Sequence, residues 1–127
     1  MLFRSAGLPD LTITDVLLLH HVNHRARNKK LADICFVLNY EDTHVVAYSL
    51  KKLVAAGLVQ TEKGGKEVFY SPTPEGEAAV QRYRAVREQC LIDNLDPPMN
   101  DALGEAARML RTMSGLYDQA ARAATAL

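Results

Sequence analysis

The chain has 127 residues, of which 48% are apolar and 24% charged, and its 15 basic and 15 acidic side chains give a formal net charge of zero. This length supports one hydrophobic core, and the composition excludes a disordered or fibrous chain. Bulk charge gives no attraction to nucleic acid, so any such affinity must come from how the charges are distributed.

The first predicted helix begins after Thr12 and runs to about His24. Thr12 and Asp15 have the spacing of a capping box, in which each side chain accepts a hydrogen bond from a free amide of the first turn. The apolar residues cover more than one stripe of this helix, which predicts a central helix packed on several sides. These residues are Val16, Leu17, Leu18, Leu19 and Val22.

A second helix is predicted from about Lys29 to Leu38, after a polar break at residues 23–28 in which Asn28 is a suitable cap. Its apolar residues recur at three- and four-residue spacing. They are Leu31, Ile34, Cys35 and Leu38. Asn39 tolerates the left-handed conformation that ends a helix, so the connection to the next helix should be a tight turn.

A third helix is predicted from about Thr43 to Ala56, with Asp42 or Thr43 as its cap and Gly57 as its stop. One face carries Val46, Leu50, Leu53 and Val54, whereas His44, Ala47, Tyr48, Lys51 and Ala55 point elsewhere. We expect this helix to bury its apolar face and to expose a polar, partly basic surface.

Two strands are predicted next, at residues 58–62 and 67–71, because both segments are rich in apolar and aromatic residues. Gly64 and Gly65 between them supply the positive backbone angles of a tight hairpin turn. This turn carries Lys63 and Lys66 at its tip.

A fourth helix is predicted to begin at Thr73 and Pro74, a cap followed by a proline in the first helical position, and to end near Ile92. Its expected buried stripe consists of Ala79, Tyr83, Val86 and Cys90. Prolines at positions 97 and 98 then break the chain, because proline cannot extend a helix.

A last helix is predicted from Asn100 to about Thr125, with two series of apolar residues that recur every seven positions. The series are Leu103, Leu110, Tyr117 and Ala124, and Ala106, Met113, Ala120 and Leu127. We expect a second subunit to cover part of this seam, chiefly Leu103, Leu110, Met113, Tyr117 and Ala120. The alternative is packing within the chain on the first and fourth helices.

The order of these elements indicates a mainly α fold with a small β wing, the winged helix-turn-helix. We expect residues 1–92 to form this domain with the fourth helix, and residues 93–127 to form a C-terminal dimerisation arm. An exposed helix beside a basic hairpin is typical of a helix in the DNA major groove with a wing on the flanking phosphates.

The charges are distributed as this interpretation requires. Residues 25–66 contain eight basic side chains against four acidic ones, whereas residues 88–127 contain three against six. A polyanion such as double-stranded DNA would therefore meet the middle of the chain and avoid its C-terminal part.

Four segments of the sequence resemble the MarR type of transcriptional regulator: LADI at 31–34, VVAYSLKKL at 45–53, GLV at 57–59 and SPTPEG at 71–76. The resemblance implies a homodimeric DNA-binding protein whose third helix reads the major groove and whose wing touches the minor groove or phosphates. A ligand-gated version is a further possibility, in which a small apolar effector sits between the DNA-binding domain and the dimer helices, as the resemblance implies for many relatives. Two features differ from the family: no long helix is expected before Thr12, and the wing lacks an Asp-x-Arg.

By this resemblance, the residues that face base edges or nearby phosphates are Thr43, His44, Ala47, Tyr48 and Lys51. Lys63 and Lys66 would serve the wing. Lys29 and Lys30 lie where the start of a helix meets phosphate, although they fit a solvated loop nearly as well. A solvated surface charge is the alternative for every one of these lysines.

Other chemistry has little support in the sequence. His20, His21 and His24 suggest a metal site, but only two of them can share a helix face and no further ligand motif completes the set, so we expect no metal. Cys35 fits a core position, whereas Cys90 leaves open a redox role. Nucleophile, nucleotide and metalloprotease motifs are absent, so we expect neither an enzyme nor a cofactor.

Two cysteines without a CxxC motif suit a reducing, cytoplasmic setting. The first ten residues do not resemble an export signal, and no apolar run is long enough to cross a membrane. The main functional alternative is a winged-helix module that binds protein instead of DNA.

Overall fold

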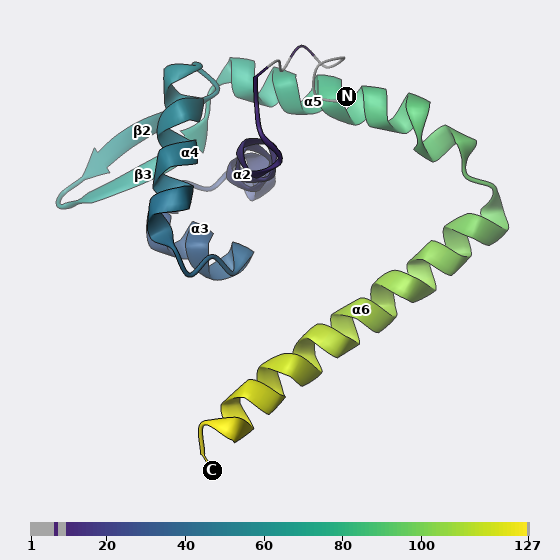
Figure 1. Cartoon of the computed structure of the whole chain (residues 1–127). Helices are drawn as coiled ribbons and strands as arrows, with labels where there is room; N and C mark the ends of the chain where they lie inside the picture. The colour runs from purple at the N-terminus through teal and green to yellow at the C-terminus, as the bar shows by residue number, and fades with distance from the viewer. Residues whose placement is uncertain (1–6, 8–9, 127) are drawn as a thin grey trace. The chain divides into compact units, whose positions relative to one another are not determined.

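The computed structural model describes residues 7 and 10–126 (Figure 1). Contacts within the chain divide it into two units, Met1–Gln89 and Cys90–Leu127. The elements in chain order are α2 (Ile13–Asn23), the 3₁₀ turn η1 (His24–Ala26), β1 (Lys29–Lys30), α3 (Leu31–Leu38), α4 (Thr43–Ala55), β2 (Val59–Gly64), β3 (Glu67–Pro72), α5 (Pro74–Cys90), the 3₁₀ turn η2 (Ile92–Asn94) and α6 (Pro97–Ala124). This mainly helical chain with a small antiparallel sheet confirms the predicted fold class.

Helix α2 is the centre of the first unit. The amide of Thr12 donates to Asp15 Oδ2 at 2.8 Å, and the amide of Asp15 donates to Thr12 Oγ1 at 3.2 Å, so the predicted capping box is present. Four of the five apolar residues predicted to pack are buried, whereas Leu17 is 43% exposed and Ile13, at the start of the helix, is 77% exposed. The helix is therefore covered on several sides, and one side stays open.

Helix α3 begins at Leu31, so the prediction that it starts at Lys29 with Asn28 as its cap is wrong. Lys29 and Lys30 form the short strand β1, which pairs antiparallel with β3 at Tyr70 and Phe69. Pairing with a strand about forty residues away satisfies the backbone groups that a helix turn would otherwise use. At its other end Asn39 has φ 55° and closes α3 as predicted.

The hydrophobic core lies where α2, α3 and α4 meet β2 and the first turns of α5. Leu18, Val22, Ile34, Leu50 and Leu53 are among its fully buried side chains. Because the core takes its residues from five elements, α4 cannot move without disturbing its neighbours.

The hairpin of β2 and β3 pairs Gly64 with Glu67, so Gly65 and Lys66 form a two-residue turn. Gly65 has φ +65°, whereas Gly64 is not in the left-handed region, which matches a type II′ turn and corrects the prediction for Gly64. A Cβ atom at position 64 would lie 2.7 Å from the Phe69 ring, so any other residue there would require this ring to shift.

Helix α5 starts as predicted: Thr73 Oγ1 accepts from the amide of Gly76 at 3.0 Å and donates to the carbonyl oxygen of Gly57 at 2.6 Å. Its buried residues are Gly76, Ala79 and Val80, all in its first two turns. Cys90 is exposed, so its predicted place in a buried stripe is wrong. The core covers only the beginning of this helix, and the remainder extends past it.

Helix α6 starts at Pro97, three residues before the predicted Asn100. Asp96 caps it by accepting a hydrogen bond from the amide of Met99 at 2.8 Å, and the two prolines occupy the first helical positions, where their missing amides cost nothing. The prolines thus separate α5 from α6 by opening the second helix. No residue of α6 is buried.

Candidate nucleic-acid interface

Helix α4 has one buried side and one open side. Asp42 caps it by accepting from the amide of His44 at 2.8 Å. Val46, Ser49, Leu50 and Leu53 are buried. Of the residues predicted to face DNA, Ala47 is half-buried and the other four, Thr43, His44, Tyr48 and Lys51, are exposed. The structure thus leaves free the surface of α4 that the sequence assigned to recognition.

Tyr48 is the largest side chain on this open surface and is 74% exposed. Binding of an apolar or planar partner to an exposed aromatic ring is favourable, because it removes the apolar surface of the ring from water. Together with Lys51 one turn further along, it gives α4 an apolar and a cationic contact on one face.

Lys63 and Lys66 lie at the end of the hairpin and are both exposed. Within the described part of the chain, neither ammonium group forms a hydrogen bond or an ion pair. The end of the hairpin therefore carries two exposed ammonium groups that are free to bind an anion.

Lys29 and Lys30 are held differently from the lysines of the hairpin. Lys29 Nζ donates to the carbonyl oxygens of Val22 at 3.0 Å, His24 at 2.7 Å and Arg27 at 3.2 Å. Its pKa is lowered, first by burial and then by the charge of Arg27. All three donors of Lys29 close the loop after α2, so in this conformation none is left for a phosphate.

Lys30 forms an exposed ion pair with Glu67 at 2.7 Å, and its Nζ lies 5.4 Å from the centre of the Phe69 ring. The hydrogen bond from this ammonium to Glu67 raises the pKa of Lys30. Such an exposed pair is weak, and a phosphate can take the place of the carboxylate.

A buried polar cluster connects α2 to α4, and the sequence indicated only its capping box. The Asp15 side chain is 3% exposed, and its carboxylate accepts hydrogen bonds from Ser49 Oγ and, at 2.7 Å, from Lys52 Nζ. Burial, the largest influence, would raise the pKa of Asp15, but the bonds from Lys52, Ser49 and Thr12 together lower it. In the sequence, Ser49 lies among the apolar residues of the third predicted helix. Because a buried hydroxyl group needs a hydrogen-bond partner, this position could have indicated the cluster.

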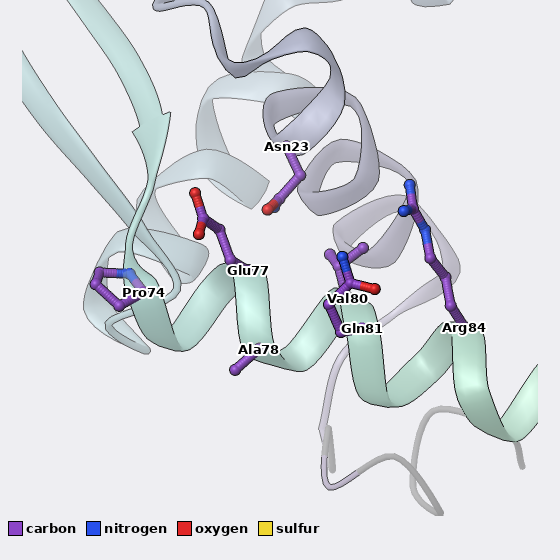
Figure 2. A pocket seen from close by; sticks show the side chains of 7 residues that line it. All are labelled: Asn23, Pro74, Glu77, Ala78, Val80, Gln81 and Arg84. Carbon is purple, nitrogen blue, oxygen red and sulfur yellow. The ribbon is translucent and has the colours of Figure 1, made fainter.

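A pocket of about 500 Å³ lies between the end of α2 and the first half of α5. Figure 2 shows Asn23 and Glu77 pointing toward one another across it, with Arg84 further along α5. Next to it, His20 packs edge-on against Tyr83 with ring centres 4.9 Å apart. The pKa of His20 is lowered first by burial and then by the charges of Arg84 and Arg87.

The metal hypothesis concerned His20, His21 and His24. Among the described residues, no group of three His, Cys, Asp or Glu side chains could hold a metal ion. Likewise, none of the helices in the described ranges has the length and hydropathy needed to span a bilayer.

The apolar seam of α6 faces solvent in the single chain. Leu103 and Met113 are 50% exposed, and Leu110 and Tyr117 are 70% exposed. Met109 and Leu116, which the sevenfold series omitted, are also exposed and widen the seam. A large apolar surface of this kind is typical of an interface.

Comparison with known proteins agrees with this geometry. Residues 11–76, more than half of the chain, match the model of the winged helix DNA-binding domain family. No curated protein sequence matches the chain.

Solved structures resemble the chain over most of its length. A crystal structure of MarR is 18% identical with a TM-score of 0.71, covering 87% of this chain and 84% of MarR. BpsR from Bordetella bronchiseptica, described as regulated in its DNA binding by 6-hydroxynicotinic acid, is 22% identical with a TM-score of 0.66, and 89% and 82% of the two chains are covered. A mutant MarR from E. coli complexed with operator DNA is 19% identical with a TM-score of 0.67, and the coverage is 86% and 81%. At these identities the likeness concerns the fold.

Proposed function

Since the chain belongs to the family of winged helix DNA-binding domains and has the fold of MarR-type regulators, we propose that it binds specific DNA sequences as a homodimeric transcriptional regulator. The observation that carries this proposal is the open polar face of α4 beside a hairpin that ends in two free lysines. The matching family model is that of a DNA-binding domain and describes no enzymatic activity.

In this proposal α4 lies in the major groove. Thr43, His44, Ala47 and Tyr48 face base edges, and Lys51 reaches a base edge or a phosphate. The hydroxyl and imidazole groups can form hydrogen bonds with base edges, while the tyrosine ring can contact a thymine methyl group. Sequence preference then depends on where these side chains lie relative to the groove.

The hairpin of β2 and β3 supplies contacts that do not depend on sequence. Lys63 and Lys66 neutralise phosphates beside the site read by α4, and Lys30 joins them when its exposed pair with Glu67 opens. Lys29, although predicted as a DNA contact, supports the loop after α2 with all three donors, and we therefore assign it no phosphate.

The second subunit is proposed to cover α6. Leu103, Leu110, Met113, Tyr117 and Ala120 follow a sevenfold repeat, and α6 has no buried residue in the single chain. Pairing of two such helices would remove a large apolar surface from water. A two-fold dimer places two copies of α4 on one face of the duplex, with half-sites about 34 Å apart.

We also propose a small-molecule effector. BpsR, which shares the fold, is described as regulated in its DNA binding by 6-hydroxynicotinic acid, and the pocket between α2 and α5 offers the carboxylate of such a ligand the guanidinium of Arg84. Binding there would act on the contact between α2 and α5. Reduced DNA affinity on addition of 6-hydroxynicotinic acid would support this, and unchanged affinity at millimolar ligand would exclude this acid as the effector.

The decisive experiment is selection of bound sequences from a random duplex pool. A two-fold symmetric product would support sequence reading and dimer symmetry together, and its half-site spacing is expected to be one helical turn. Recovery of unenriched sequences would refute sequence-specific binding.

The alternative is a winged-helix module that binds protein without DNA. The two functions differ in their response to salt, because displacement of counterions makes the affinity for DNA fall steeply as salt rises. Absent or salt-insensitive binding to mixed genomic DNA would favour the protein-binding module.

A further inference from the structure

The cluster around Asp15 joins the N-terminus of α2 to the middle of α4. One carboxylate oxygen accepts from the amide of Thr12 at 2.8 Å and from Lys52 Nζ at 2.7 Å, and the other accepts from Ser49 Oγ. Lys52 Nζ also donates to the carbonyl oxygen of Asp10 at 2.6 Å. Asp10, just before α2, and Asp15, in its first turn, are thus tied to a single face of α4 by one ammonium and one hydroxyl group.

This polar contact differs in kind from the other contacts of α4. Val46, Leu50 and Leu53 pack against the core through apolar contacts, which are nearly independent of direction. Hydrogen bonds weaken steeply when their angle changes, so the bonds of Ser49 and Lys52 restrict rotation of α4 about its axis. In some proteins such charged clusters specify a unique arrangement and add little stability, and we assign that role to this cluster.

The rotation of α4 about its axis affects DNA recognition because the side chains proposed to contact base edges belong to this same helix. Lys52 lies one turn from Tyr48 and next to Lys51, so the cluster borders the open face. Side-chain tips lie about 5–6 Å from a helix axis, and a rotation of about 10° therefore moves them about 1 Å. A displacement of this size is enough to misalign hydrogen bonds to base edges, whereas a lysine that contacts phosphate can follow it.

We propose that Asp15 is a positioning residue for DNA reading, which sets the rotation of α4 through Ser49 and Lys52 without touching DNA itself. The inference rests on the proposed function, because it requires α4 to be the element that reads bases. Loss of the cluster should lower discrimination between sequences and leave the attraction to phosphate unchanged.

The test compares two affinities of each variant. The first is for a duplex selected from a random pool by the wild-type protein, and the second is for a mixed-sequence duplex of equal length; their ratio measures discrimination. Asp15→Asn removes the negative charge with little change in shape, and Lys52→Met removes the ammonium but keeps an unbranched stem. Both should lower the ratio about tenfold, which corresponds to the loss of one good base contact, with an unchanged salt slope on the mixed duplex.

Two further variants separate positioning from stability. Val80→Ala opens a cavity in the core at α5, away from the cluster, and should lower the melting temperature while the ratio stays at the wild-type value. Lys52→Arg keeps a cation next to Asp15 and should restore most of the ratio lost in Lys52→Met. All affinities are calculated from the concentration of folded protein.

The possible results decide between the two proposals. If the wild-type protein shows no preference for any duplex, both the proposed sequence-specific DNA binding and the positioning role of Asp15 are refuted. If the wild type discriminates but Asp15→Asn and Lys52→Met keep its ratio, or Val80→Ala lowers the ratio equally, only the positioning role is overturned. Should Asp15→Asn not fold, Lys52→Met decides alone, because the Lys52 side chain is 34% exposed and Asp15 keeps its bonds to Thr12 and Ser49.

Discussion

Replacement of Lys51 and Lys66 by alanine should flatten the salt dependence of DNA binding. Both side chains are exposed, one on α4 and one on the hairpin turn, and within the described residues neither ammonium has a partner to lose. The change therefore removes positive charge from the proposed interface without breaking a contact in the folded chain. Stability should remain close to that of the wild type.

The magnitude follows from the number of phosphates that lose a counter-charge. Each neutralised phosphate contributes about 0.9 to the slope of log affinity against log salt, so two lysines in each of two protomers contribute about 3.6. Between 50 and 200 mM salt, the wild-type protein should consequently lose about 100-fold more affinity than the double variant.

The assay is a fluorescence anisotropy titration of mixed-sequence duplex DNA at a series of salt concentrations. Arg122→Ala is the matched control, because it removes an exposed cation from α6, outside the proposed interface. It should leave the slope unchanged. An unchanged slope in the Lys51 and Lys66 variant would show that neither residue neutralises a phosphate, and the assigned interface would be wrong.

Three other properties can be checked directly. Gly76→Ala should lower the free energy of unfolding by about 3 kcal/mol in a denaturant titration, because its Cβ would lie 1.9 Å from the carbonyl oxygen of Leu58. His20 has a pKa below its ordinary 6.5, first through burial, so the folded state resists its protonation and stability should fall as the pH drops below about 6.5. Leu110→Glu, at a position 70% exposed in the single chain, should convert the proposed dimer to a monomer by light scattering.

Matched variants test these three expectations. Gly104→Ala adds the same methyl group where nothing lies within 4 Å and should not destabilise the protein. His20→Gln should weaken the pH dependence of the melting temperature below 6.5, and an unaltered profile would show that another group causes it. Gln119→Glu adds the same charge to α6 outside both the sevenfold series and the widened seam; loss of the dimer in this variant as well would argue against a specific seam.

Features that depend on neighbouring residues were predictable from the sequence. The capping box of Thr12 and Asp15, the left-handed Asn39 and the start of α5 at Thr73 and Pro74 all follow from hydrogen bonds and backbone preferences within a few residues. The two faces of α4 follow from the spacing of its apolar residues, since a helix buries the side on which they gather. These local rules were sufficient for the fold class and for the open surface of α4.

Features that depend on contacts between residues far apart in the sequence were not predictable in the same way. Lys29 and Lys30 have the composition of a helix start, but pairing with β3 makes them a strand and leaves Lys29 bonded to three carbonyls. Cys90 follows a helical apolar spacing, yet the core reaches only the first turns of α5. The spacing of apolar residues along α5 shows which side of the helix can be buried, but not how far along the helix the core extends.

Residues within one or two turns of each other were enough to predict every helix and strand except β1, and also which side of α4 is apolar. The tertiary structure alone decided that Asp15 meets Ser49 and Lys52, that Gly76 lies against Leu58, and that the lysines at 29 and 30 serve the sheet. Each of these contacts joins residues at least 18 positions apart, and only the packing of the core brings their atoms within bonding distance.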